Sequence, residues 1–300
     1  MRVNPSMVNN ILADLQQSQA TLNTALQQVA TGKKVNTPSD DPGASAVMVG
    51  NTVASAQVDQ YTQNATSMLS MVQTADSSLS AVVSALNQAV TLGTEGANGT
   101  TNTANRQAIA LQVQSILSSV VAQANTSYNG TYLFSGTANV KPYTADSTSS
   151  SGYTYDGNEG TNSVAVGDQF SVQVNLPGDQ IFSNSSADVL GSLNALVSAL
   201  QSGDSTAIST ATNQVSSALS YVTQQRVFYG NAESQLTSQQ TYLSSESVTL
   251  SSQADSLTKV DLAQAATELT QAQTANSAAM AAAAKVLPQT LLNYLSTPTS

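Results

Sequence analysis

The strongest constraint on this chain is a narrow line of apolar and small residues that recurs at both ends of the sequence. Near the N-terminus the line consists of Val8, Ile11, Leu15, Ser18, Leu22, Ala25 and Val29. After Lys259 it consists of Leu262, Ala265, Leu269, Ala272, Asn276, Ala279 and Ala283. Spacings of three and four place such residues on one thin stripe of an α-helix, which is typical of coiled-coil packing. We therefore expect the two ends to pair as antiparallel helices, and rods of this kind are usually parts of assemblies.

Two interior segments continue the helical pattern. One seam consists of Ala54, Val58, Tyr61, Ala65, Met68, Val72, Ala75, Leu79, Val82, Leu86 and Ala89. Another consists of Leu236, Leu243, Leu250 and Leu257, which are spaced by seven. Shorter helices are expected over about 103–126 and 188–202.

Between these helices, residues 128–182 are rich in tyrosine, glycine and alternating valine, which is typical of short strands. Asp156-Gly157 is a candidate hairpin turn. The predicted fold is mainly α with a β insertion: an elongated antiparallel helical coiled-coil rod, built from paired N- and C-terminal regions, with a small β domain in the middle.

Both sides of the predicted rod are interrupted at corresponding places. Gly32 is expected to end the first helix, and Asp41 followed by Pro42 is expected to cap and start the next. Opposite this connector, five residues separate Leu257 from Leu262, which shifts the register. The residues of this joint motif are Gly32, Asn36, Pro38, Asp40, Asp41 and Pro42.

The joint suggests a division into stacked segments. The predicted domains are paired terminal helices at 1–32 and 262–300, a helical rod at 33–128 and 203–261, a β-rich insert at 129–187 and a short linking helix at 188–202.

Composition argues against most enzymatic and nucleic-acid roles. The chain has no His and no Cys, which removes the commonest general base and the thiolate nucleophiles and ligands. Eight basic and eighteen acidic residues give a net charge of −10, whereas nucleic-acid binding needs a basic footprint. We expect no membrane-spanning segment and no cleavable signal peptide, so the chain is either cytoplasmic or exported by another route.

Three features invite a sharper interpretation but have a plainer one. Asp40-Asp41 is better explained by helix capping than by a metal site, because no third ligand is apparent. Residues 156–160 lack the acidic ladder of a calcium loop. The tyrosines between Tyr128 and Tyr155 can form a carbohydrate surface but more often pack a small β domain. We predict no cofactor and no metal.

Two segments resemble a known family. Residues 22–42, LNTALQQVATGKKVNTPSDDP, resemble the N-terminal signature of bacterial flagellins and hook-associated proteins, and residues 259–273, KVDLAQAATELTQAQ, resemble their C-terminal signature. Within the family, PSDDP at 38–42, GTYLFSG at 130–136 and Arg226 with Gly230 are more similar to the members at the hook–filament junction than to flagellin. Residues 287–292, LPQTLL, are more similar to flagellin.

The resemblance implies a secreted, extracellular, non-enzymatic subunit of the bacterial flagellum, exported unfolded by the flagellar type III apparatus. It implies copies of the same chain, an adjacent hook-associated protein and flagellin subunits as partners, together with an export chaperone on the C-terminal helix. The predicted assembly interface, which orders on assembly, consists of Val8, Ile11, Leu15, Leu22, Leu26, Val29, Leu262, Leu269, Leu287, Leu291 and Leu295. Two alternatives stay open: flagellin itself, and a secreted enzyme whose activity resides in residues 130–187.

Overall fold

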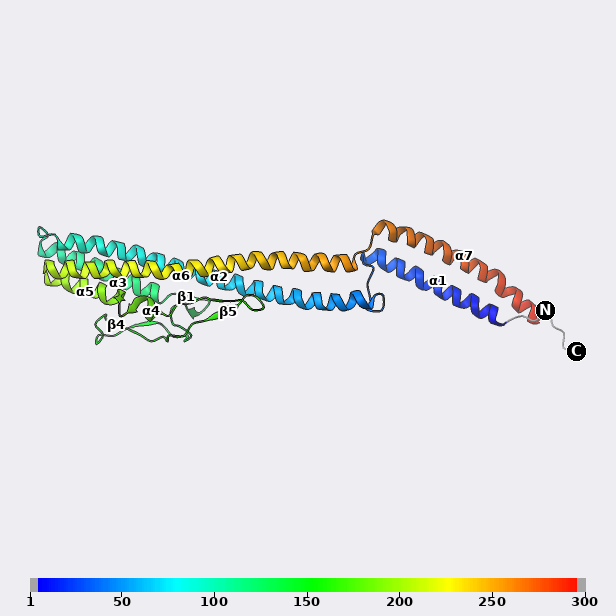
Figure 1. The fold of residues 1–300 in the computed structure, drawn as a ribbon, viewed down its shortest axis with the longest axis horizontal. Helices are drawn as coiled ribbons and strands as arrows, with labels where there is room; N and C mark the ends of the chain where they lie inside the picture. Colours follow the sequence, from blue (N-terminus) through cyan, green and yellow to red (C-terminus); the bar gives the residue numbers. More distant parts are fainter. Residues whose placement is uncertain (1–4, 296–300) are drawn as a thin grey trace. The chain divides into compact units, whose positions relative to one another are not determined.

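The computed structural model describes the backbone of residues 5–295 and the side chains of residues 9–285. The long helices are α1 (Pro5–Thr31), α2 (Pro42–Ala97), α3 (Thr103–Ala124), α5 (Val189–Ser202), α6 (Ser205–Thr258) and α7 (Leu262–Leu295) (Figure 1). By its internal contacts the chain divides into unit 1, Met1–Gln57 with Glu246–Ser300, and unit 2, Val58–Ser245.

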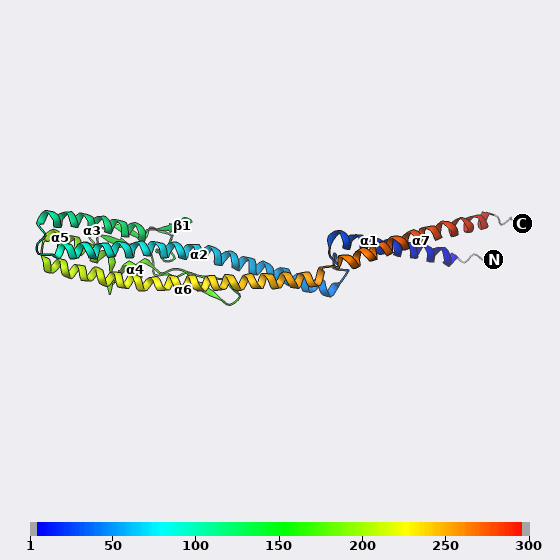
Figure 2. The ribbon, with the colours of Figure 1, turned by 90° about the horizontal axis from the view of Figure 1, so that it is seen from above.

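Unit 1 is built around the pairing of α1 with α7, which lie side by side in both views (Figures 1 and 2). Its other part consists of the first turns of α2 and the last turns of α6, which are joined by a hydrogen bond of 2.8 Å from Asn51 Nδ2 to the Leu250 carbonyl. In unit 1, α2 and α7 each begin directly after an aspartate that caps the helix. Asp41 Oδ1 accepts from the Ala44 amide and Asp261 Oδ1 from the Ala263 amide, at 2.9 Å each.

Unit 2 contains the main hydrophobic core, in which α3 packs against α5 and both accompany α2 and α6 (Figure 2). The seam predicted along α2 faces this core. Its buried members in unit 2 are Val58, Ala65, Val72, Ala75, Leu79, Val82, Leu86 and Ala89. Gly93 and Gly96 allow close approach here, since a Cβ on either would lie 2.3 Å from Thr212 Oγ1 or Leu200 Cδ2 respectively. The sequence prediction of a long buried helical seam is confirmed.

The middle of the chain forms four separate antiparallel strand pairs. They are β1 (Ser127–Tyr128) with β2 (Thr131–Tyr132), β3 (Tyr143–Ala145) with β4 (Tyr153–Tyr155), β5 (Ser163–Ala165) with β6 (Ser171–Gln173), and β7 (Ser183–Asn184) with β8 (Ala187–Asp188). A short helix, α4 (Gly178–Phe182), precedes β7.

One turn prediction was wrong. The hairpin turn with the type I′ backbone is Asn129-Gly130, between β1 and β2, where φ is +49° and +80°. Asp156-Gly157 follows β4, whose partner β3 precedes it in the chain, so this dipeptide joins no paired strands.

An aromatic cluster attaches the strand region to α6. Phe134 meets Phe182 edge-on at 5.4 Å between ring centroids, and Tyr229 of α6 at 6.4 Å. The Tyr229 hydroxyl accepts a hydrogen bond of 3.2 Å from the Leu176 amide. Tyr143 is also buried, and its hydroxyl donates to the Gly178 carbonyl at 2.8 Å. The strands therefore share one continuous core with the helices.

The predicted fold class, mainly α with a β insertion, is confirmed. Within residues 5–295, no helix combines the length and the apolar character needed to cross a bilayer. The predicted domain boundaries stay a prediction.

Candidate assembly surface and helix joint

The seam at the two termini pairs α1 with α7 but is only half covered. Ala25, Ala265 and Ala272 are buried, whereas Ile11, Leu15 and Leu22 on α1 are half-buried, as are Val29 and Leu269. Leu26 and Leu262, two of the predicted interface residues, are 44% and 58% exposed. The side chains of Val8, Leu287, Leu291 and Leu295 lie outside the described side chains. Whether these positions contact a neighbouring subunit stays a prediction.

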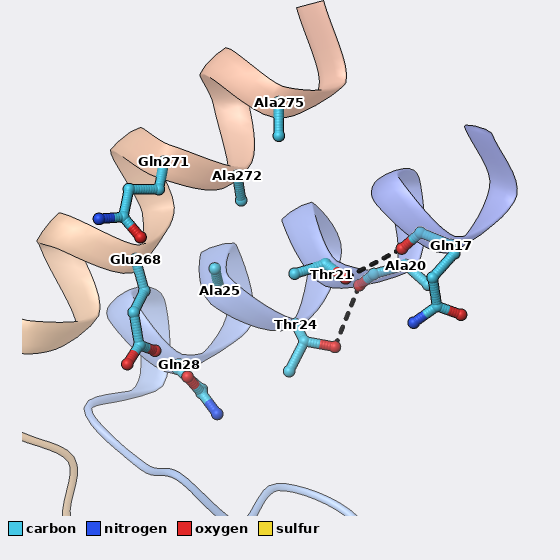
Figure 3. A pocket seen from close by; sticks show the side chains of 10 residues that line it. All are labelled: Gln17, Ala20, Thr21, Thr24, Ala25, Gln28, Glu268, Gln271, Ala272 and Ala275. Atoms are coloured by element: carbon cyan, nitrogen blue, oxygen red, sulfur yellow. Dashed lines mark hydrogen bonds between the residues drawn. The ribbon is translucent and has the colours of Figure 1, made fainter. Parts of the chain in front are cut away.

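A groove of about 540 Å³ runs along the α1–α7 pair (Figure 3). Its alanines are Ala20 and Ala25 on α1 and Ala272 and Ala275 on α7, and its edges carry Gln17, Gln28, Gln271 and Glu268. Thr21 and Thr24 also line it, and their hydroxyls donate back to the Gln17 and Ala20 carbonyls at 2.9 and 3.1 Å. Because those hydroxyls are engaged within α1, the wall is less polar than its composition suggests. Small residues on both helices leave room for another helix to approach closely.

Two polar seam residues remain unsatisfied in the single chain. Ser18 Oγ on α1 and Asn276 Oδ1 on α7 are buried and have no hydrogen-bond partner among the described residues. A buried polar atom without a partner costs on the order of 1–3 kcal/mol. The α1–α7 pair is therefore less favourable than its apolar contacts alone suggest.

The predicted joint is a backbone bridge between the two connectors of unit 1. Lys33 and Lys259 form an antiparallel bridge, in which the Lys34 amide donates to the Thr258 carbonyl at 2.6 Å and the Val260 amide to the Gly32 carbonyl at 3.0 Å. Gly32 has φ of +68°, and its amide donates to the Gln28 carbonyl at 2.9 Å, so it ends α1 as expected. The two interruptions thus face each other, as the register shift predicted.

Asp40 folds the longer connector on itself. Its Oδ2 accepts from the backbone amides of Asn36 and Thr37 at 2.8 Å each. The hydrogen bonds from Thr37 and Asn36 hold the pKa of the Asp40 carboxyl below its ordinary value. Asn36 Nδ2 donates to the Lys33 carbonyl at 2.9 Å, which ties the turn to the bridge. The joint motif is therefore a set of caps and turns.

An apolar groove beside the joint was not predicted from the sequence. It has a volume of about 330 Å³ and lies between the connector and the first turns of α2, lined by Val35, Asn36, Thr37, Pro38, Ser45, Met48, Val49, Thr52 and Val53. Val49 and Val53 are 66% and 56% exposed. The sequence did hold one sign of this groove. Val47, Val49 and Val53 lie outside the buried seam of α2, on a face whose other exposed positions are mostly polar.

The family-like arginine of α6 makes the ion pair of unit 2. Arg226 Nε and Nη2 donate to Asp76 Oδ1 and Oδ2 at 2.9 and 2.8 Å, so the pair is bidentate. The hydrogen bonds that Arg226 donates to Asp76 raise the pKa of Arg226. Both side chains are about 30% exposed, which limits the pair to about 1 kcal/mol. Arg226 therefore links α6 to α2 at the level of Asp76.

The described part of the chain holds no cluster of side chains suited to a metal ion. Among the described residues, no three acidic side chains lie close enough together to hold a metal ion. Asp40 and Asp41 each accept from backbone amides, in the capping roles described above.

Two family models match the chain, one over its N-terminal helices and one over most of α6 and α7. The model for the bacterial flagellin N-terminal helical region matches residues 4–139, and the model for the C-terminal helical region matches residues 212–295. Together they cover more than half of the sequence. The chain belongs to the bacterial flagellin family. In this flagellin-family chain both sides of the joint lie inside the matched regions.

Curated relatives include hook-associated proteins and flagellins. The chain is 36% identical to flagellar hook-associated protein 3 of Escherichia coli over 111 residues, which cover 37% of this chain and 35% of that protein. It is 33% identical to the same protein of Salmonella typhimurium over 138 residues, which cover 45% and 44%. A flagellin of Listeria monocytogenes is 27% identical over 140 residues, which cover 46% and 49%. The flagellin-family chain thus spans between about a third and a half of the length of these relatives.

A solved structure supports the fold. The flagellar junction protein FlgL of Legionella pneumophila superposes with a TM-score of 0.60 at 15% identity, covering 71% of this chain and 100% of that one. At this identity the likeness shows only the fold of the flagellin-family chain. The role of the chain is inferred below from its exposed helix faces.

Proposed function

We propose that this chain is a structural, non-enzymatic subunit that joins the hook to the filament of the bacterial flagellum. The observation that carries the proposal is the incomplete burial of the terminal helix seam. Leu26 and Leu262 are exposed and the seam leucines are only half-buried, although both helices already pair with each other. A stripe that its own chain cannot cover is suited to burial against neighbouring copies.

Repetition makes weak contacts sufficient. Burial of apolar area contributes roughly 25 cal/mol per Å², so one thin seam stabilises little. In a closed ring every subunit makes the same contact twice, and the contributions of all copies add. The proposed contact residues on α1 and α7 are Val8, Ile11, Leu15, Leu22, Leu26, Val29, Leu262, Leu269, Leu287, Leu291 and Leu295.

The junction role is favoured over flagellin by the pattern of relatives. Over comparable lengths the chain is 33% identical to a hook-associated protein 3 and 27% identical to a flagellin. In this proposal the joint separates two stacked segments, the terminal helices inside and the longer helices outside. The neighbours are copies of this chain, an adjacent hook-associated protein and flagellin.

Export belongs to the same proposal. The chain leaves the cell unfolded through the flagellar type III apparatus, with a chaperone held on the C-terminal helix, and it acts outside the cell. Only 9% of its residues are charged, so helices pack in a lattice with few buried charges to compensate.

An enzyme in the insert is less well supported. Among the titratable side chains of the insert, burial raises the pKa of Tyr143 and raises that of Tyr155 to about 12. These shifts move the two hydroxyls away from the range in which a general base operates. The tyrosines serve packing, since both contact the aromatic cluster.

Deletion of the gene for this chain tests the proposal. We expect hooks without filaments in electron micrographs, with flagellin released into the medium, and recovery on complementation with the full chain. Filaments of normal length in the deletion strain would contradict a junction role.

Copy number in isolated flagella separates the two family members. A few copies per flagellum support the junction subunit, whereas thousands of copies support flagellin. Self-assembly of the purified chain into long filaments would also favour flagellin.

A further inference from the structure

The outer faces of α2 and α6 carry exposed valines at the same level of unit 1. The hydrogen bond of 2.8 Å from Asn51 to the Leu250 carbonyl joins the facing sides of the two helices, where both residues are buried. The helices run antiparallel, as the contacts of Thr66 with Gln240 and Asp76 with Arg226 show further along. Val53, two residues after Asn51, is therefore level with Val248, two residues before Leu250.

On α2 the outer face is hollowed. Val49 and Val53 each lie two residues from Asn51, which is about 200° around the helix, on the side away from α6. They form one wall of the 330 Å³ groove, and Val35 and Pro38 of the connector form part of the other. No charged residue lines this groove. It is an apolar recess at the outer edge of the helix pair.

On α6 the outer face carries an exposed valine side chain. Val248 lies about 200° from Leu250 and is 67% exposed. Asp255, seven residues further on, lies on the same stripe and is also exposed. Valine is a poor helix former, and the described residues leave most of this one uncovered. The edge opposite the recess thus carries an apolar projection with a carboxylate beside it.

Charge at the two edges is complementary. The Lys34 amide is bonded to the Thr258 carbonyl, which places Lys34 about 5 Å along the axis from the level of Asp255. Neither side chain forms an ion pair among the described residues. In a chain of net charge −10, copies repel unless opposite charges meet. Lys34 directly precedes Val35 of the groove wall, and Asp255 lies on the stripe of Val248, so each of the two surfaces carries one of the two charges.

We propose that a second copy of this chain docks the Val248 face of its α6 into the Val49–Val53 groove of the first, with Asp255 of one copy beside Lys34 of the other. The two surfaces differ, so the contact is heterologous and leaves a free groove and a free projection at the ends. Because they lie at one level, successive copies add without a rise along the helix pair, as a ring requires. The inference rests on the proposed function and specifies its lateral contact.

Cysteine cross-linking tests the contact, because the chain has no cysteine of its own. Flagella are isolated from cells that produce the full-length chain with Val49→Cys and Val248→Cys together, and are treated with a mild oxidant or a short bismaleimide. We expect a ladder of dimers, trimers and larger products on denaturing gels, while each single variant stays monomeric. The matched control pairs Val49→Cys with Gln112→Cys, an exposed position on α3, and should give no ladder.

The charge pair gives an independent measurement. Lys34→Glu should lower the amount of chain retained in flagella, or the ladder yield in the double-cysteine background, by at least about fivefold. Adding Asp255→Lys should restore it. Equal retention and ladder yield in all of these variants would overturn the proposed charge contact.

The outcomes distinguish the contact from the function. Absence of the wild-type chain from isolated flagella contradicts the proposed function. Presence of the double-cysteine chain without a ladder contradicts the groove contact alone. Dimers from either single variant indicate an isologous contact and also overturn the proposal.

Discussion

In unit 2 the helical seam lies inside a core, whereas in unit 1 a similar seam lies on a two-helix pair. Leu79, Val82 and Leu86 on α2 are fully buried by α3, α5 and α6. The equivalent residues on α1, Leu15 and Leu22, are only half-buried. The same spacing of three and four therefore produces two different states of burial.

The difference lies in the number of neighbours and in side-chain size. The seam of α7 that faces α1 consists mostly of alanine. Each helix also contributes a buried polar atom with no hydrogen-bond partner among the described residues, Ser18 Oγ on α1 and Asn276 Oδ1 on α7. Large side chains from several elements fill unit 2, including Phe134, Phe182 and Tyr229. The comparison teaches that a seam pattern specifies a helix face but not what covers it.

The largest expected contrast is in amide exchange of the isolated full-length chain. The amide of Leu79 should open only with global unfolding, at a free energy of about 5–15 kcal/mol. Amides of Leu15 and Leu269 should exchange within roughly a hundredfold of unstructured rates, because most helical stability comes from tertiary packing and these two helices share only a thin seam. Mass spectrometry after hydrogen exchange measures both. Strong protection at Leu15 and Leu269 would remove the distinction between the units.

Leucine truncation tests the same contrast by stability. Leu79→Ala should lower the free energy of unfolding by about 3 kcal/mol, through lost burial and a residual cavity. Leu22→Ala should cost less than about 1 kcal/mol in the isolated chain, since its side chain is already half exposed. Denaturant titration followed by circular dichroism gives both values. If Leu22→Ala lowers the free energy of unfolding as much as Leu79→Ala, the two seams do not differ in burial as the structure shows.

The helical part of this fold could be predicted from the sequence because its determinants are local. Gly32, Asp41 and Pro42 mark a helix end and a helix start by their own backbone chemistry, and the structure places both boundaries there. The register shift between Leu257 and Leu262 revealed a second interruption. Pairing the two seams predicted that this interruption faces the Gly32–Pro42 connector, but the backbone bridge between Lys33 and Lys259 was seen only in the structure.

What could not be predicted depends on contacts between distant residues. Asp156-Gly157 has hairpin chemistry, yet β4 finds its partner upstream, since the aromatic cluster around Tyr143 and Tyr155 holds β3 beside it. The groove at Val49 and Val53 was missed because its opposite wall is the connector, whose path no periodicity specifies.

Removal of one buried hydroxyl should have a moderate effect in unit 2. Tyr229→Phe deprives the Leu176 amide of its acceptor and should cost about 1–2 kcal/mol in the free energy of unfolding. The matched control is Tyr221→Phe, whose exposed hydroxyl donates to the Gln180 carbonyl at 2.8 Å and should cost about 0.5 kcal/mol or less. Equal losses would mean that the Leu176 amide finds another acceptor.

Alkaline pH should destabilise unit 2 in particular. Burial raises the pKa of Tyr143 and Tyr229, and that of Tyr155 to about 12, above the ordinary value of 10.0. The unfolded chain releases these protons first, so the contribution of these tyrosines to stability is constant below about pH 10 and falls as pH rises above it. Tyr155→Phe should flatten the fall between about pH 10 and 12, whereas Tyr242→Phe, at a 60% exposed position, should not. Denaturant midpoints across this range measure the slope.

The smallest expected effect lies at the joint of unit 1. Amide hydrogen bonds from Thr37 and Asn36 keep the Asp40 pKa low, so its contribution is present above the ordinary carboxyl pKa and is lost as pH falls through the lowered one. Asp40→Asn should therefore loosen residues 36–40 at neutral pH and remove their acid dependence, without changing the melting of unit 2. Exchange rates of the Asn36 and Thr37 amides, measured by nuclear magnetic resonance between about pH 2 and 6 after correction for intrinsic exchange, report the local change. Equal loosening by acid in Asp40→Asn and in the wild-type chain would show that the Asp40 carboxylate does not stabilise this turn. The joint would then depend on the Lys33–Lys259 bridge alone.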